Sequence, residues 1–207
     1  MTVQDNARTL VQRITALPAR DTRLMIAIAG PPGSGKSTLA EAVVEMLTAA
    51  GKAAVLMPMD GFHLDNRLLE PAGLLPRKGA PETFDFGGLA SALARIRDGQ
   101  TVLLPVFDRS REEAIAGAAR IGPETRIVVV EGNYLLLDED PWRDLAAYWD
   151  LAAFLTVPED ELERRLIARW LSFGHDARAA ATKAQANDLP NARRVVRAVH
   201  APDLVLE

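Results

Sequence analysis

The segment GPPGSGKS at residues 30–37 combines residue types that bind polyphosphates. Gly30, Gly35, Lys36 and Ser37 fit the pattern G-x-x-x-x-G-K-[ST], which a chain of this length matches by chance in roughly one sequence in a hundred. We expect Lys36 to hold the β and γ phosphates of a nucleoside triphosphate and Ser37 to ligate Mg²⁺. The alternative is a glycine-rich turn that only links a strand to a helix. The predicted nucleotide-binding residues are Gly33, Ser34, Gly35, Lys36, Ser37 and Thr38.

Two carboxylates follow apolar runs elsewhere in the chain. Glu131 comes directly after residues 127–130 (IVVV), and Asp60 follows residues 53–59 (AAVLMPM). Because the carboxyl ends of parallel strands lie at one edge of a sheet, both side chains can reach the phosphate site. We expect Glu131 to face the metal, directly or through water. Asp60 can instead cap a turn, because Asp-Gly is a common turn pair.

The elements that must position these residues are short apolar runs that alternate with helical patterns, which predicts an α/β fold. The runs are hydrophobic throughout, as is typical of a parallel sheet with helices on both faces, and ligands are expected beyond its carboxyl ends. Helical patterns cover residues 37–51, 86–99 and 159–174. The predicted strands are residues 23–30, 53–60, 101–108, 126–132, 150–157 and 203–207.

Composition narrows the class of protein. With 207 residues, 48% of them hydrophobic, we expect one domain over residues 1–207, because a single core serves domains of up to roughly 250 residues. A net charge of −4 does not suit a general nucleic-acid binder, and the absence of cysteine excludes disulfides and thiolate metal sites. No run approaches the roughly 20 apolar residues that span a bilayer, and the first residues lack a signal-peptide core. We expect a cytoplasmic protein without membrane insertion, and its oligomeric state stays open.

The fate of the terminal phosphate separates two classes of P-loop protein. A GTPase switch or ATPase module spends the nucleotide on conformational change, and guanine-binding members usually carry an N-K-x-D element. The sequence lacks this element, since TKAQ at residues 182–185 has no acid. A kinase needs an acceptor pocket and a base near the hydroxyl, and polar clusters lie where such a pocket is expected. We therefore favour a kinase over an ATPase.

Five segments in order, GPPGSGKST, DGFHLDN, KGAPETFD, PVFDRS and EGNYLLL, resemble the P-loop kinases grouped with uridine kinase, phosphoribulokinase and bacterial pantothenate kinase. The chain most resembles the small branch of sugar kinases labelled fructose transport system kinases. The resemblance implies a P-loop NTPase three-layer fold with a helical lid, and transfer of a phosphoryl group from Mg·ATP to a small molecule's hydroxyl. It also implies that Asp60 is the catalytic base, Glu131 the metal-side acid and Asp85 part of the acceptor pocket.

The acceptor is less well defined by the resemblance. Uridine kinases show D-S-F-Y where this chain has D-G-F-H at residues 60–63, and pantothenate kinases are longer chains. In the P-x-Y-D segment, Phe107 replaces the usual tyrosine. We expect a sugar or sugar-like acceptor, and uridine-like or pantothenate-like specificity remains an alternative. His175 and His200 are expected to be surface histidines. The predicted acceptor residues, of mixed charge, are His63, Arg67, Lys78, Glu82, Asp85, Asp108 and Arg109.

The helix predicted at residues 159–174 carries two different faces. Leu162, Leu166 and Trp170 fall at helical spacing and would face the body of the protein, while Arg165 and Arg169 share another stripe. In the kinases that the chain resembles, this segment, about residues 158–178, is a lid whose arginines act in catalysis by closing on the phosphates. The alternative is an ordinary surface helix with ion pairs. By the same resemblance, Asn187 or Asn191 lies near the adenine.

Overall fold

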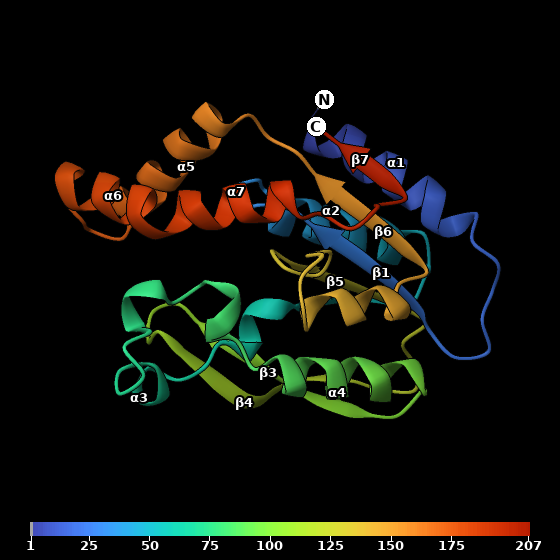
Figure 1. Ribbon diagram of the computed structural model, residues 1–207. Helices are drawn as coiled ribbons and strands as arrows, with labels where there is room; N and C mark the ends of the chain where they lie inside the picture. Colours follow the sequence, from blue (N-terminus) through green and yellow to red (C-terminus); the bar gives the residue numbers. More distant parts are fainter. Residues whose placement is uncertain (1) are drawn as a thin grey trace.

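The computed structural model describes residues 2–207, and a parallel sheet forms its centre. The strands lie in the order β2-β5-β1-β6-β7, so β1, which precedes the P-loop, is the middle strand (Figure 1). All neighbouring strands in this sheet pair in parallel. The strands are β1 (Leu24–Ala29), β2 (Ala54–Pro58), β5 (Ile127–Gly132), β6 (Leu151–Leu155) and β7 (Leu204–Leu206).

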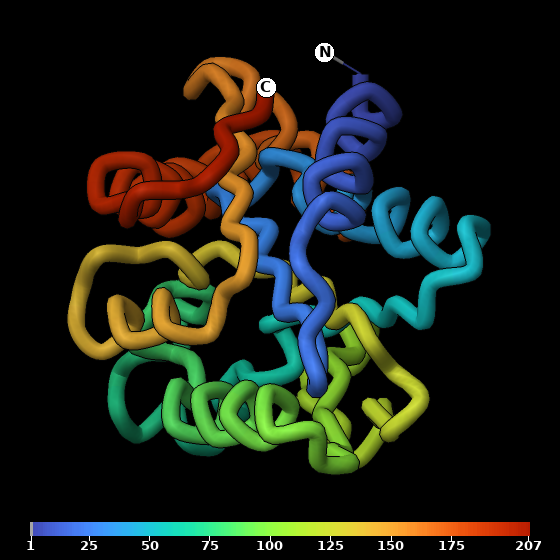
Figure 2. Tube along the Cα trace, turned by 90° about the vertical axis from the view of Figure 1, so that its right-hand side faces the viewer, coloured from blue at the N-terminus to red at the C-terminus, as the bar shows by residue number. Residues whose placement is uncertain are grey.

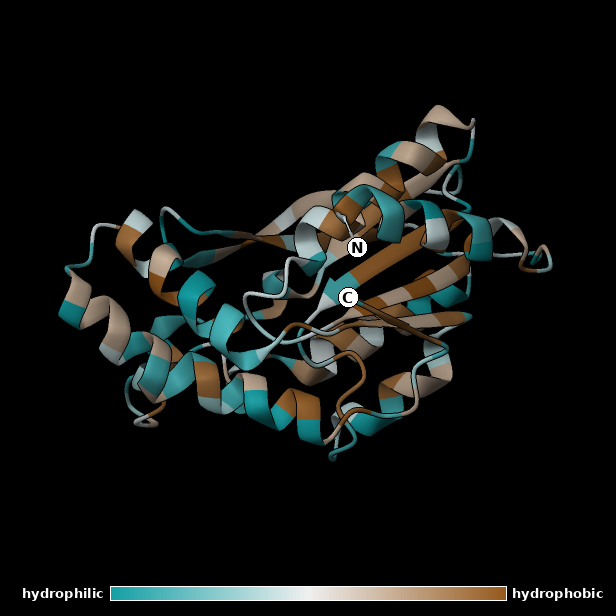
Figure 3. Ribbon diagram, turned by 90° about the horizontal axis from the view of Figure 1, so that it is seen from above, coloured by the Kyte–Doolittle hydropathy of each residue, from teal (hydrophilic) through white to brown (hydrophobic). Residues whose placement is uncertain are grey.

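Helices cover both faces of this sheet, which explains the uninterrupted apolar runs. Ile26 and Ile28 of β1 pack with α1 (Val3–Thr15) and α2 (Lys36–Ala49) on one face. Met25, Ala27 and Ala29 point to the other face, where they join α4 (Phe86–Arg97) and η4 (Trp142–Tyr148). Figure 3 shows the brown, hydrophobic ribbon concentrated on the central strands. The fold is therefore the predicted three-layer α/β arrangement.

The strand predicted at residues 101–108 exists, but its placement in the parallel sheet was wrong. It forms β3 (Val102–Asp108), which pairs antiparallel with β4 (Glu113–Ile121) in a separate two-stranded sheet. Only one face of this hairpin packs on the core, since Val102 and Leu104 are buried whereas Leu103 is 63% exposed. The apolar Leu103 hides this alternation in the sequence. β4 itself was not predicted, because it is short of large apolar residues.

A group of helices near the C-terminus forms an arm that we call the lid, after its predicted role. It consists of α5 (Glu159–Ser172), α6 (Ala177–Lys183), the π-helical turn η5 (Ala184–Asp188) and α7 (Leu189–Arg197), which together form the orange and red arm of Figure 1. Leu162 and Leu166 of α5 are buried in a small core with Leu189 of α7. The predicted lid segment, residues 158–178, covers α5 and only the beginning of α6.

Short helices connect β2 to α4 and form one wall of the site. They are η1 (Met59–Phe62), α3 (Asn66–Leu69), η2 (Leu75–Arg77) and η3 (Pro81–Thr83). Helix α1 and the end of β7 lie close together (Figure 2), and the amide group of Asn6 donates a hydrogen bond to the main-chain oxygen of Glu207 across 2.8 Å. Within residues 2–207, none of the helices has the length and apolar character needed to cross a membrane.

Candidate active site

The P-loop connects β1 to α2 at the carboxyl edge of the parallel sheet. Gly33 and Gly35 have φ angles of 82° and 92°, a left-handed conformation that side chains disfavour. Gly35 is the N-cap of α2, and no side chain caps this helix. The N–H groups of its first turn therefore remain available to an anion, and the helix dipole favours a negative charge there. This arrangement fits a polyphosphate.

A cavity of about 1040 Å³ opens above the P-loop. Its walls come from the P-loop, η1, the β3–β4 hairpin and the lid, so segments far apart in the sequence converge on it. The predicted site residues that line it are Gly33, Gly35, Lys36, Ser37, Thr38, Asp60, His63, Lys78, Arg109, Glu131, Arg169 and Asn191.

Glu131 and Lys36 form the charged floor of the cavity. Glu131 is only 5% exposed, and its Oε2 accepts a hydrogen bond from the Ser37 hydroxyl across 3.1 Å. Burial raises the pKa of Glu131, an effect that the nearby Lys36 opposes. Burial likewise lowers the pKa of Lys36, opposed by Glu131 and then by Asp60. Each charge therefore supports the ionised form of the other.

The donor set suits a cation that arrives with phosphate. Among residues 2–207 there is no cluster of three or more His, Cys, Asp or Glu side chains that would hold a metal alone. Mg²⁺ usually keeps several waters and is bound through one or two carboxylates plus substrate phosphates. Ser37 and Glu131 provide such a partial site beside the P-loop.

Asp60 lies in η1, directly after β2, and its carboxylate faces the cavity. No backbone N–H of the described residues donates a hydrogen bond to the Asp60 carboxylate, so the turn-capping alternative has no support. Instead its Oδ2 accepts a hydrogen bond from Nη2 of Arg109 across 2.6 Å. The following Gly61 is needed for packing, because a Cβ there would lie 2.2 Å from the carbonyl oxygen of Pro105. Packing against β3 thus explains why a glycine follows Asp60.

Aromatic rings shape the side of the cavity formed by His63, Phe84 and the β3–β4 hairpin, which we call the acceptor side after the predicted role of its residues. The ring of His63 lies between those of Phe84 and Phe107, with centroid distances of 4.1 and 4.6 Å. Burial lowers the pKa of His63, which favours a neutral imidazole at pH 7. Nζ of Lys78 donates hydrogen bonds to Oδ1 of Asn66 and to a backbone carbonyl, and it lies 5.2 Å from the Phe107 ring centroid.

The two arginines of α5 take different positions. Arg169 lines the cavity and donates a hydrogen bond to Asp188 across 3.2 Å, while its buried Nε has no partner among the described residues. Such an unpaired donor fits an arriving phosphate oxygen. Arg165 lies outside the cavity lining and bonds to Glu161 and to the carbonyl oxygen of Ser34. Arg165 therefore fits the alternative of an ion-paired surface helix, whereas Arg169 faces the cavity.

Other predicted site residues have different surroundings. Asp85 caps α4, and Asp108 accepts hydrogen bonds in the turn after β3. Arg67 pairs with Asp65, Glu82 pairs with Arg77 and with Arg194 of α7, and Ser34, within the P-loop itself, is buried. The structure does not bring these five side chains into the cavity lining.

Several cavity residues were not predicted from the sequence. His175 was expected at the surface, but the turn between α5 and α6 brings it into the lining beside Trp170, whereas His200 is exposed. Asn133 lies two residues after Glu131, and its buried Oδ1 has no partner among the described residues. In the sequence, the feature that could have indicated this wall of the cavity is the close spacing of Trp170, Phe173 and His175. The other unpredicted lining residues include Asn66, Phe84, Glu112, Thr182, Lys183 and Asp188.

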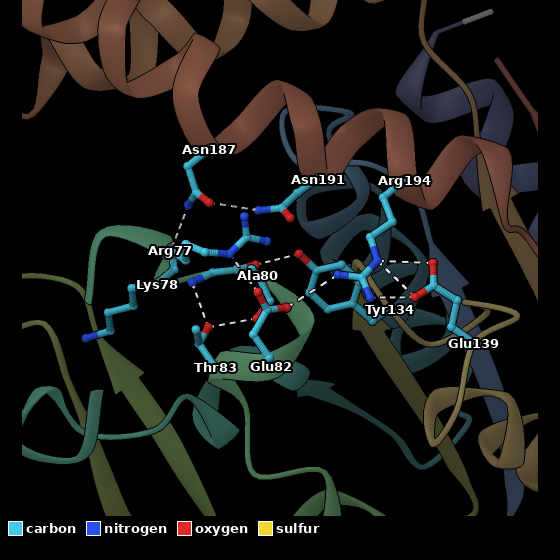
Figure 4. Close-up of polar contacts among 11 residues, drawn as sticks. Arg77, Lys78, Ala80, Glu82, Thr83, Tyr134, Glu139, Asn187, Asn191 and Arg194 are labelled. Carbon is cyan, nitrogen blue, oxygen red and sulfur yellow. Dashed lines mark hydrogen bonds and ion pairs between the residues drawn. The ribbon is translucent and has the colours of Figure 1, made fainter. Parts of the chain in front are cut away.

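Polar contacts join the lid to the acceptor side across the cavity (Figure 4). Nδ2 of Asn187 donates a hydrogen bond to the carbonyl oxygen of Lys78 across 2.9 Å. Arg194 of α7 forms ion pairs with Glu82 and Glu139, the first at 3.3 Å. These contacts hold residues 77–83 against the lid helices.

The fold and the cavity define a P-loop protein, and the family that its sequence matches makes it a kinase, a phosphotransferase. Residues 25–206 match the Phosphoribulokinase / Uridine kinase family, and the chain belongs to this family.

Three comparisons place the chain within this family. The crystal structure of a "putative fructose transport system kinase" from Silicibacter sp. TM1040 superimposes with a TM-score of 0.93 at 49% identity, over 100% of both chains. The "Uncharacterized protein YggC" of Escherichia coli is 35% identical, covering 89% of this chain and 78% of its own. The "Putative uridine kinase C227.14" of Schizosaccharomyces pombe is 32% identical, covering 96% of this chain and 88% of its own.

Proposed function

We propose that this protein transfers the γ-phosphoryl group of Mg·ATP to a hydroxyl group of a sugar or sugar-like small molecule. The observation that carries the proposal is the position of Asp60, whose carboxylate faces the same cavity as Lys36 and Glu131. A kinase needs a base beside its phosphate site, whereas an ATPase has no use for an aromatic acceptor pocket. The 49% identical relative named for a fructose transport system favours a sugar over uridine or pantothenate.

When bound, Mg·ATP supplies the phosphoryl group and the cation that neutralises its charge. The N–H groups of the P-loop and the ammonium group of Lys36 hold the phosphates. Ser37 and Glu131 hold the cation, directly or through water. Arg169 binds the phosphoryl oxygens through its unpaired Nε, and Asn191 lies beside the adenine.

Asp60 acts as the base. It takes the proton of the acceptor hydroxyl as that oxygen bonds to the γ-phosphorus and the bond to the leaving ADP oxygen breaks. His63 and Phe107 orient the acceptor through their ring faces, and Lys78 and Arg109 bind its polar groups. The whole chain, in this proposal, is one domain.

The test is a screen of sugars, polyols and sugar acids for acceptor-dependent ADP release, with the phosphorylated product identified by mass spectrometry. Asp60→Asn keeps the shape of the side chain and removes its basicity, so turnover should fall by roughly a hundredfold to ten thousandfold while Mg·ATP still binds. Asp21→Asn, at an exposed position, is the matched control. Near-normal turnover of Asp60→Asn at saturating acceptor would contradict the role of base.

A further inference from the structure

The acceptor side of the cavity contains two cations, Lys78 and Arg109, in addition to Lys36 and Arg169 elsewhere in the lining. Nζ of Lys78 lies 5.2 Å and the guanidinium carbon of Arg109 5.9 Å from the centroid of the Phe107 ring, so the two charges share one ring. Lys36 and Arg169 already serve the P-loop end of the cavity. Each cation of the acceptor side has a carboxylate partner in the cavity, since Nζ of Lys78 lies 3.6 Å from Oε2 of Glu112 and Arg109 pairs with Asp60. The acceptor end therefore presents two cations around one aromatic ring, each held by an exchangeable carboxylate.

The ion pair between Arg109 and Asp60 conflicts with the role of Asp60 as a base. Nη2 of Arg109 lies 2.6 Å from Oδ2 of Asp60, and the remaining Asp60 side chain is 25% exposed. The Asp60 oxygen that accepts this hydrogen bond is not free to accept the proton of the acceptor hydroxyl. Arg109 thus occupies one of the two carboxylate oxygens of the proposed base.

Arg109 is placed so that this pair can break. Its side chain is 57% exposed and lies just after β3, at the beginning of the turn that leads to β4. Ion pairs with so much exposure are weak, because water competes for both partners. A neutral acceptor offers the guanidinium group no replacement for the lost carboxylate, whereas an anionic acceptor offers one with matching bidentate geometry.

We propose that the acceptor carries an anionic group, a carboxylate or a phosphate monoester, which replaces Asp60 as the partner of Arg109. Binding of this acceptor frees Asp60 to take the hydroxyl proton, and Lys78 provides the second positive charge for the anionic group. Arg109 is therefore a specificity-determining residue that couples acceptor recognition to release of the base. This inference rests on the proposed kinase function and narrows its acceptor to acidic hydroxy compounds.

The first experiment compares acceptors of equal carbon number and different charge: glycerol, glycerate and glycerol 3-phosphate, and likewise glucose, gluconate and glucose 6-phosphate. For the wild type, kcat/KM for an anionic member should exceed that for its neutral counterpart about a hundredfold or more, since a site built around a polar partner rejects analogues that lack it. Comparison of the carboxylates, glycerate and gluconate, with the two phosphate esters identifies which anionic group the protein uses. Equal or better use of the neutral members would overturn the proposal.

The second experiment compares Arg109→Gln with Arg111→Gln, a neighbouring arginine that is 67% exposed and outside the cavity lining. Arg109→Gln should reduce the preference for the anionic acceptor to less than about tenfold, because kcat/KM falls for that acceptor and does not fall for its neutral counterpart, whose base is no longer paired. Arg111→Gln should retain the wild-type preference. An unchanged preference in Arg109→Gln would contradict the assignment.

A third measurement requires no acceptor. Because loss of Arg109 frees Asp60, Arg109→Gln should hydrolyse ATP several-fold faster than the wild type in the absence of acceptor, and the double variant Asp60→Asn, Arg109→Gln should lose this increase. Unchanged or slower hydrolysis by Arg109→Gln would show that Arg109 does not restrain the base. If the wild type phosphorylates no compound of either series, the proposed kinase function fails for these acceptors, while the hydrolysis rates still decide the role of Arg109.

Discussion

The hydroxyl group of Ser37 donates a hydrogen bond to Oε2 of Glu131 across 3.1 Å, which joins the first turn of α2 to the end of β5. The P-loop and the central sheet thus meet at one buried carboxylate. The pairing also places a hydroxyl and a carboxylate oxygen side by side, as a cation beside the phosphates requires.

Glu131→Gln tests this pair. Glutamine can still accept the hydrogen bond from Ser37, but it lacks the negative charge that attracts a divalent cation. We expect the Mg²⁺ concentration for half-maximal activity to rise about tenfold or more, as measured by titration at fixed ATP. Glu45→Gln, at an exposed position of α2, should match the wild type. An unchanged Mg²⁺ requirement in Glu131→Gln would remove Glu131 from the metal site.

Lys36→Ala should abolish most of the phosphoryl transfer. The ammonium group is the cation that the P-loop itself contributes to the cavity, so its loss should lower kcat/KM by a hundredfold or more, as typical for a lost electrostatic contact. ADP release and the affinity for a fluorescent ATP analogue measure the two effects separately. Lys52→Ala, an exposed lysine, serves as the control. Undiminished activity of Lys36→Ala would refute the placement of the active site at the P-loop.

The two arginines of α5 should differ when each is replaced by alanine. Arg169→Ala removes the unpaired cavity donor, so kcat should fall by about a hundredfold with a smaller change in KM for ATP. Arg165→Ala removes a hydrogen bond to the P-loop carbonyl of Ser34, so it should mainly raise KM for ATP. Steady-state kinetics at saturating acceptor measure both parameters. Equal effects of the two variants would contradict the different positions of these side chains.

The pH dependence of stability should contain a contribution from His63. Burial lowers the pKa of His63 below its ordinary value of 6.5, so the unfolded chain binds a proton that the folded chain rejects. This residue therefore decreases the free energy of unfolding as the pH falls through 6.5, and the decrease ends below the folded-state pKa. The advantage of the wild type in Tm over His63→Gln should thus be larger at high pH than at low pH. His200→Gln provides the exposed control, and parallel Tm curves for wild type and His63→Gln would contradict the prediction.

Much of the fold could be predicted because its strongest signals are local. The three inner strands of the parallel sheet, β1, β5 and β6, are buried on both faces, and their apolar runs mark them in the sequence. The edge strands β2 and β7 are only partly buried but also consist mainly of apolar residues. The strand at residues 102–108 shows the limit of this reasoning, because its register partner β4 has few large apolar residues and lies at the surface. An apolar run indicates a strand, but the sheet that the strand joins depends on contacts distant in the sequence.

The candidate site was predictable to a similar degree. The P-loop, Asp60 and Glu131 follow strand ends of the parallel sheet, and the topology alone brings these ends together. Asp85 and Asp108 were predicted from the residue type and the resemblance, yet the structure uses both as local caps. His175 could not be predicted, because its position depends on how α6 turns back after α5. Sequence patterns thus identify the phosphate end better than the acceptor end.

The contacts between the lid and residues 77–83 bear on how reactants enter and leave. If the lid moves away from residues 77–83, the hydrogen bond from Asn187 to Lys78 and the ion pair between Arg194 and Glu82 must break. The side chains of Arg194 and Glu82 are 36% and 37% exposed. Ion pairs so accessible to solvent weaken as salt concentration rises, whereas an amide hydrogen bond responds much less. An enzyme limited by departure of its products would therefore turn over faster in moderate salt, and one limited by the transfer itself would not. Ionic strength thus offers a way to learn which event sets the pace of this kinase.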